Sequence, residues 1–114
     1  MKLEYLQTAQ PGARWFRGYY RQNPQLNLPK AVAALRVAEA ILREQPMAGT
    51  RVEGRLSVRE YNITGTAFSL LYSVVADNIW IIDIRDQRGL RSAEALRTFT
   101  SELRQRFGLD KDLR

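Results

Sequence analysis

The sequence of 114 residues contains no cysteine and no histidine. Without cysteine, no disulfide can form and no thiol can act as a nucleophile. Without either residue type, a zinc site is disfavoured and a nucleophile activated by histidine is excluded. The acidic residues also lack the clustered spacing of a magnesium or calcium site. We therefore expect no metal ion and no other cofactor.

Long apolar segments are missing too. No run approaches the roughly 20 residues that a transmembrane helix needs. The N-terminus, MKLEYLQT, has the pattern of a strand and lacks the apolar centre of a secretion signal. These features predict a cytoplasmic protein without membrane attachment, folded as one domain over residues 1–114.

Basic residues outnumber acidic ones, 18 to 12, which gives a formal net charge of +6. Of these 18, 15 are arginines. The guanidinium group forms paired hydrogen bonds with phosphates and with carboxylates. Nucleic acid and an acidic protein are therefore both candidate partners, and a merely solvated basic surface is the alternative.

The first half of the chain predicts a strand followed by a helical hairpin. Residues 2–8 alternate as a strand does, and helices are predicted over residues 11–22 and 30–45. Asn27 can cap the second helix, and the short Asn/Pro linker favours two packed helices. Trp15 and Tyr19 give the first helix an aromatic flank, suited to the core or to a partner. On the second helix, four charged side chains are expected to face water: Arg36, Glu39, Arg43 and Glu44.

The middle of the chain predicts three consecutive strands, within residues 56–63, 68–74 and 79–84. Short turns join them, so they form an antiparallel meander. Residues 50–55 are expected to be a connector. The nearly continuous apolar run at 79–84 is typical of a central strand covered on both faces, and Asp83 within it is expected to pair with an arginine.

A last helix is predicted over about 92–107, with Ser92 as N-cap and Gly108 as C-cap. Its apolar stripe either packs on the body or docks a partner, and comprises Leu96, Phe99, Leu103 and Phe107. The predicted fold class is α+β: an N-terminal strand, a helical hairpin, a three-stranded antiparallel meander and a C-terminal helix.

Four short motifs carry a resemblance to a known family. They are PMAG at 46–49, VREY at 58–61, TAFSLLYSV at 66–74 and IRDQRG at 84–89. With this order of elements, the chain resembles the RelE/ParE toxin superfamily over residues 1–89. These proteins are the toxins of bacterial type II toxin–antitoxin modules. The motifs around Arg59 and at 66–74 are nearer to the ParE-like, plasmid-stabilisation branch.

The resemblance implies two different activities. RelE-like members are ribosome-dependent endonucleases that cut mRNA, and ParE-like members inhibit DNA gyrase by binding it. A nuclease here would use Arg85, Arg88 and Glu94. However, Ser69 stands where such nucleases carry an arginine, and no tyrosine follows Arg88 within residues 90–95. Cleavage needs a base, an acid and charge stabilisation, so these losses weaken the nuclease hypothesis.

The leading hypothesis is a ParE-like toxin that binds gyrase and is neutralised by an acidic antitoxin in a hetero-oligomer. A nuclease that acts on ribosome-bound mRNA and a non-toxic family member are the alternatives. Target or anion binding is assigned to Arg59, Arg85 and Arg88. Ion pairs with Asp83, Asp86 or Glu60 are the structural alternative for these arginines. The antitoxin is expected to contact Trp15, Tyr19, Leu96, Phe99 and Leu103.

Overall fold

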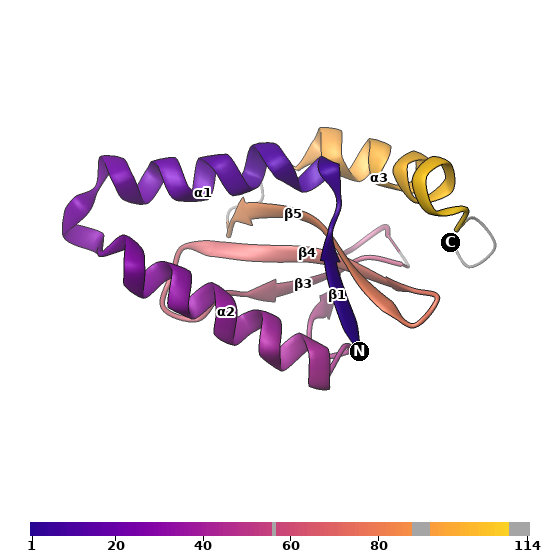
Figure 1. Ribbon diagram of the computed structural model, residues 1–114, viewed down its shortest axis with the longest axis horizontal. Helices are drawn as coiled ribbons and strands as arrows, with labels where there is room; N and C mark the ends of the chain where they lie inside the picture. The colour runs from indigo at the N-terminus through magenta and orange to yellow at the C-terminus, as the bar shows by residue number, and fades with distance from the viewer. Residues whose placement is uncertain (56, 88–91, 110–114) are drawn as a thin grey trace.

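The computed structural model describes residues 1–55, 57–87 and 92–109, and it has the predicted α+β class (Figure 1). A five-stranded mixed sheet lies between helical layers. The strands are β1 (Lys2–Tyr5), β2 (Thr50–Arg51), β3 (Arg59–Asn62), β4 (Phe68–Val75) and β5 (Asn78–Asp86); the α-helices are α1 (Gln10–Gln22), α2 (Leu28–Glu44) and α3 (Ala93–Phe107).

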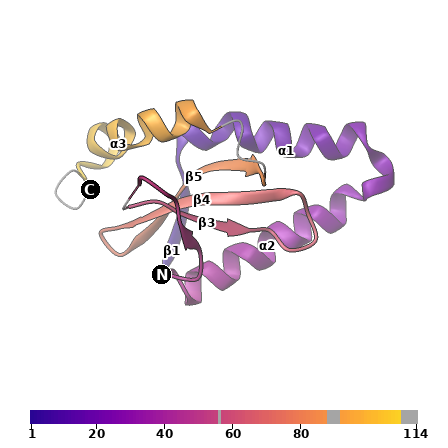
Figure 2. The same cartoon turned by 180° about the vertical axis from the view of Figure 1, so that it is seen from behind.

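The strand order in the sheet is β1-β5-β4-β3-β2. The predicted meander is present as β3, β4 and β5, which pair antiparallel. The sheet continues beyond it on both sides, because β1 pairs in parallel with β5 and β2 pairs with β3. Figure 2 shows β3, β4 and β5 from behind, on the side away from the viewer of Figure 1. The prediction of a connector over 50–55 was wrong for Thr50 and Arg51. A strand of two residues is too short to show the alternation that identifies strands.

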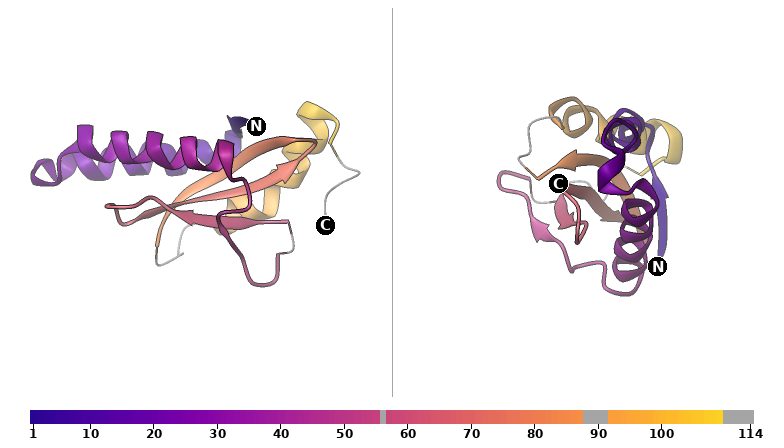
Figure 3. Two further views of the ribbon diagram at one scale, coloured as in Figure 1. Left: turned by 90° about the horizontal axis from the view of Figure 1, so that it is seen from below. Right: turned by 90° about the vertical axis from the view of Figure 1, so that its left-hand side faces the viewer.

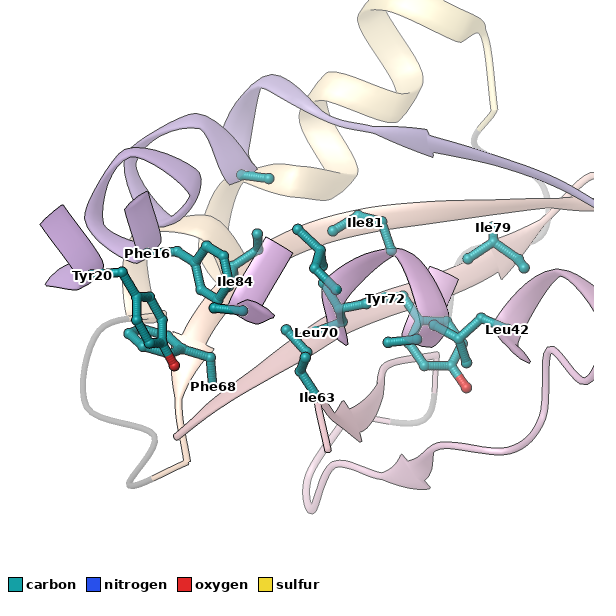
Figure 4. Close-up of a cluster of buried hydrophobic side chains, with 14 residues drawn as sticks. Phe16, Tyr20, Leu42, Ile63, Phe68, Leu70, Tyr72, Ile79, Ile81 and Ile84 are labelled. Carbon is teal, nitrogen blue, oxygen red and sulfur yellow. The ribbon is translucent and has the colours of Figure 1, made fainter. Parts of the chain in front are cut away.

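Helices α1 and α2 cover the first face of the sheet, the face toward which Leu70 and Tyr72 point (Figures 3 and 4). The Asn27 side chain caps α2 as predicted, accepting a hydrogen bond of 3.1 Å from the amide of Lys30. Phe16 from α1 and Leu42 from α2 are fully buried in this core. Their apolar stripes supply the burial that holds the helical layer on the sheet.

The expectation that Glu39 faces water was wrong, because this side chain is buried. Its carboxylate accepts a hydrogen bond of 2.5 Å from the Tyr5 hydroxyl of β1. Both carboxylate oxygens also lie 2.9 Å from Nη1 of Arg36. A buried carboxylate requires such partners. The hydroxyl belongs to Tyr5 on strand β1. The expectation for Glu39 was based on the periodicity of α2, which does not show that β1 lies beside this helix.

Tyr72 is fully buried in the first core. Its hydroxyl donates a hydrogen bond of 2.6 Å to the carbonyl of Pro46 and accepts one of 2.9 Å from the amide of Gly49. The tyrosine therefore fastens the loop after α2 to the sheet.

Helix α3 covers part of the second face. Phe99 and Leu103 are fully buried there against Leu71 and Ile82, among others. This confirms that β5 is covered on both faces, since alternate residues of the strand enter the two cores. Gly108 is the predicted C-cap, with φ of 67° and its amide bonded to the carbonyl of Arg104.

Ser92 occupies the N-cap position of α3, but the predicted capping by its side chain was wrong. Its hydroxyl donates a hydrogen bond of 2.8 Å to Oδ2 of Asp83 on β5 instead. Helix α3 is also tied to the chain that follows β1. The Glu102 carboxylate accepts hydrogen bonds of 2.8 Å and 3.1 Å from the amides of Gln7 and Thr8. Polar contacts thus hold α3 on the sheet near its start and in its second half.

Candidate functional site at the polar end of the second sheet face

Side chains on the second face change character along the sheet. Next to α3 this face is apolar, with Leu71, Val75 and Ile82 in the core. Farther along the same face, the pairing of β3, β4 and β5 brings together Glu60, Asn62, Ser69 and Arg85. We call these four residues the polar cluster. Alternate residues of a strand share a face, so β3, β4 and β5 together produce this patch.

Arg85 and Glu60 form a two-pronged ion pair at the centre of the polar cluster. Nη2 of Arg85 lies 2.9 Å from Oε1 of Glu60, and Nε lies 3.3 Å from Oε2. The side chains are only 13% and 24% exposed. The structural alternative for Arg85 is therefore present, with Glu60 as the partner in place of Asp83 or Asp86. The guanidinium is neutralised, so an incoming phosphate must compete with a carboxylate for it.

Ser69 and Asn62 complete the polar cluster. The Ser69 hydroxyl is fully buried and donates a hydrogen bond of 2.8 Å to Oδ1 of Asn62. A cavity of about 610 Å³ lies along the β2–β3 edge beside them, lined by Ala48, Thr50, Glu60, Tyr61, Asn62, Thr64 and Gln87. Its side chains offer carboxylate, amide, phenol and hydroxyl groups, which suits hydrogen bonding with a protein surface.

Arg59 does not join the polar cluster. It pairs with Tyr72 across β3 and β4, on the first face of the sheet. Its Nη1 donates a hydrogen bond of 2.8 Å to the carbonyl of Gly49. Arg59 therefore helps Tyr72 to hold the loop at 46–49, and the structure separates it from Arg85. The third predicted residue of this set, Arg88, lies outside the described residues.

Glu94, the candidate base of a nuclease, lies in the first turn of α3. Its side chain is 73% exposed and pairs with Arg97. Arg85 pairs with Glu60 on β3, and no hydrogen bond or ion pair among the described residues joins Arg85 to Glu94. A general base must come within hydrogen-bond reach of the substrate group that it deprotonates. The structure does not hold Glu94, the candidate base, next to Arg85, the candidate phosphate-binding group.

A buried carboxylate lies nearby on β5. Asp83 accepts hydrogen bonds from the amide of Ile84 and from Ser92, rather than from the arginine expected for it. Burial raises the pKa of Asp83 to about 6, because desolvation disfavours the charged form more than these hydrogen bonds favour it. Asp83 and Glu94 line a cavity of about 290 Å³ between α1, β5 and α3.

The residues assigned to antitoxin binding divide into two groups. Trp15 and Tyr19 are partly buried, and their rings pack against the Phe68 ring in T-shaped geometry at centroid distances of 5.2 Å and 5.5 Å. Phe99 and Leu103 are fully buried beneath α3, and Leu96 packs at the border of the same core. A partner could reach Phe99 and Leu103 only if α3 left the sheet, so in this structure they form the core.

Sequence reasoning missed Glu60 as the partner of Arg85. Part of the signal was present, since Glu60 lies in a predicted strand and Arg85 directly follows another strand of the same meander. Strand β5 extends to Asp86 and so includes Arg85. Their contact depends on register, which a β-bulge between β4 and β5 at Leu71/Tyr72 shifts by one residue.

Comparisons with known proteins add no assignment, because no family model, curated protein or solved structure matches this chain. Among the described residues, no group of three or more aspartate and glutamate side chains is placed to hold a metal ion. The described helices also include none with the length and apolar character needed to cross a membrane.

Proposed function

We propose that this protein is a ParE-like toxin of a type II toxin–antitoxin module, which inhibits DNA gyrase in the cytoplasm by binding rather than by cleaving a substrate. The Arg85–Glu60 ion pair is the observation that carries the proposal. A phosphodiester-cleaving site needs cationic groups free to stabilise a phosphate. Here Glu60 binds the Arg85 guanidinium through two contacts, so the pair offers polar groups for recognising a protein rather than a free cation for a phosphate.

Two further features support the same function. Within residues 1–89, the chain's order of strand, helical hairpin and antiparallel strands is the order that the family resemblance implies. The position at which a RelE-like nuclease carries an arginine holds Ser69, whose hydroxyl is buried and already bonded to Asn62. The polar cluster thus supplies hydrogen-bonding groups for a protein target but lacks a second cation among its described members.

The test is a gyrase assay with purified protein. The wild-type chain should inhibit supercoiling of relaxed plasmid or accumulate cleaved plasmid. Arg85→Ala together with Glu60→Ala removes both sides of the pair and should abolish inhibition. The control is Arg104→Ala, which changes an exposed side chain of α3 and should retain inhibition. Circular dichroism must show that all three proteins are folded.

Other outcomes identify the alternatives. Codon-phased cuts in cellular mRNA after induced expression, mapped by primer extension, would establish the nuclease and overturn the proposal. Normal growth, intact mRNA and unaffected gyrase would indicate a non-toxic family member.

A further inference from the structure

The cavity between α1, β5 and α3 is acidic, although the chain as a whole carries a net charge of +6. It encloses about 290 Å³ where the first turns of α1 and α3 meet over β5 (Figure 1). Asp83 and Glu94 supply carboxylates, and no arginine or lysine is among the described residues that line it. None of the four residues of the polar cluster lines it either. The cavity is therefore a separate candidate site, and its charge favours a cation.

Asp83 lies at the floor of the cavity, where its side chain is buried. Its oxygens accept hydrogen bonds of 2.9 Å from the amide of Ile84 and 2.8 Å from the Ser92 hydroxyl, and neither donor is charged. No ion pair between described residues includes Asp83. A carboxylate has about four lone-pair positions, so Asp83 can accept further hydrogen bonds. Burial raises its pKa to about 6, as expected for a carboxylate without a bound cation.

Glu94 lies at the mouth of the same cavity. Its side chain is 73% exposed, and it pairs with Arg97, which is 70% exposed. An ion pair this exposed contributes little, because water screens it, so a bound ammonium can take the place of Arg97. The cavity thus has one carboxylate at its buried end and one at its open end.

The walls between the two carboxylates are largely apolar. Trp15, Ile84 and Ala95 contribute hydrocarbon surface, and the Thr98 hydroxyl already donates a hydrogen bond to the carbonyl of Glu94. Two carboxylates alone do not make a metal site, and no group of three or more acidic side chains among the described residues is placed to hold a metal ion. The arrangement suits an organic cation with an apolar middle.

We infer that this cavity binds a short aliphatic diamine, with one ammonium group on Asp83, the other on Glu94, and the methylene groups against Trp15 and Ile84. An ammonium carries three donors and forms charge-assisted hydrogen bonds with carboxylates. The indole face of Trp15 also favours a nearby cation. The volume is at the lower end of the range for ligand pockets, which fits a ligand of this size. The inference does not rest on the proposed inhibition of gyrase.

The experiment titrates the full chain with putrescine and with cadaverine, followed by calorimetry and by amide chemical shifts. It is done at about pH 7.5, where a carboxyl group of pKa about 6 is ionised. Butylamine, butanediol and magnesium chloride are the comparison ligands. We expect saturable binding of a diamine, with the largest shifts around Gly12, Ile84 and Ala95. Butylamine should bind at least about tenfold more weakly, because it lacks one charge-assisted contact.

Three variants test the two ends and the shape of the cavity. Asp83→Asn and Glu94→Gln each remove one carboxylate charge, and each should weaken diamine binding at least about tenfold. Glu94 is exposed, so its variant keeps the test valid if Asp83→Asn does not fold. Thr98→Phe fills the cavity, keeps both carboxylates and should abolish binding. The matched control is Glu44→Gln, which removes an exposed carboxylate on α2 outside the cavity and should retain the affinity.

Four results would overturn the inference. Neither diamine binds at millimolar concentration; butylamine or magnesium binds as tightly as the better diamine; Thr98→Phe leaves diamine affinity unchanged; or Glu44→Gln weakens binding as much as Glu94→Gln does. The amide of N-acetyl-lysine is a further probe, because a lysine side chain of another protein carries the same ammonium group. Tighter binding of this probe than of either diamine would assign the cavity to a protein partner and also overturn the inference.

Discussion

Gly12 and Gly18 lie in the same helix but in opposite surroundings, and substituting each by alanine gives a sharp test of the fold. A Cβ atom at Gly12 would lie 2.1 Å from Oδ1 of Asp83 and 2.3 Å from the carbonyl oxygen of Ile84. At Gly18, no atom would lie within 4 Å. Helix α1 therefore approaches the backbone of β5 at Gly12 as closely as only glycine allows.

The expected effects differ in sign. Alanine is better than glycine in a helix by about 0.5–1 kcal/mol, so Gly18→Ala should stabilise the protein by that amount. Gly12→Ala gains the same term but must displace β5 backbone or α1 itself. Overpacking of this kind costs about 1–3 kcal/mol and sometimes more. The clash also disturbs the Asp83 carboxylate, so the cost should lie at the upper end of this range and the net loss should be about 2 kcal/mol.

Urea denaturation followed by tryptophan fluorescence measures both variants, with Trp15 and Trp80 as reporters in the two cores. The midpoint should fall for Gly12→Ala and rise slightly for Gly18→Ala, at an unchanged slope. Equal midpoints for the two variants would refute the close approach of α1 to β5.

Three further predictions concern buried polar groups. The contribution of Asp83 to stability should be complete below about pH 4 and lost as the pH rises through about 6, because burial raises the pKa of the folded state's carboxyl from 3.8 to about 6. The pKa shift corresponds to about 3 kcal/mol of unfolding free energy, at about 1.4 kcal/mol per pKa unit. Asp83→Asn should remove this pH dependence in urea titrations from pH 4 to 7. Parallel stability–pH profiles of the wild type and the variant would contradict the prediction. Ser73 is buried in an apolar setting and its hydroxyl has no hydrogen-bond partner among the described residues, so Ser73→Ala should raise the free energy of unfolding by about 1 kcal/mol. Glu102→Ala should cost about 2 kcal/mol by leaving the amides of Gln7 and Thr8 without their acceptor, whereas the exposed Glu94→Ala on the same helix should change stability by less than about 0.5 kcal/mol. Equal effects of the two glutamate substitutions would show that α3 is not anchored by Glu102.

Local patterns in the sequence were enough for most elements. Both helices of the hairpin, the C-terminal helix and the three meander strands lie where periodicity and capping residues place them. Asn27 and Gly108 act as the predicted caps, because capping depends on a few neighbouring residues. The apolar run at 79–84 correctly indicated a strand that contributes to two cores.

The partners of charged side chains were not predictable in the same way. The residues themselves showed that Glu39 is on a helix, that Arg59 is on a strand and that Arg85 follows the last strand, which the structure extends to Asp86. Only the packed structure decided that Glu39 is buried under Tyr5, that Arg59 bonds the loop after α2, and that Arg85 pairs with Glu60 on the opposite face. Helix and strand periods are local, so the sequence determined the elements. The Tyr5–Glu39 hydrogen bond and the Arg85–Glu60 ion pair join residues 34 and 25 positions apart through register and helix placement, so the tertiary structure decided the site.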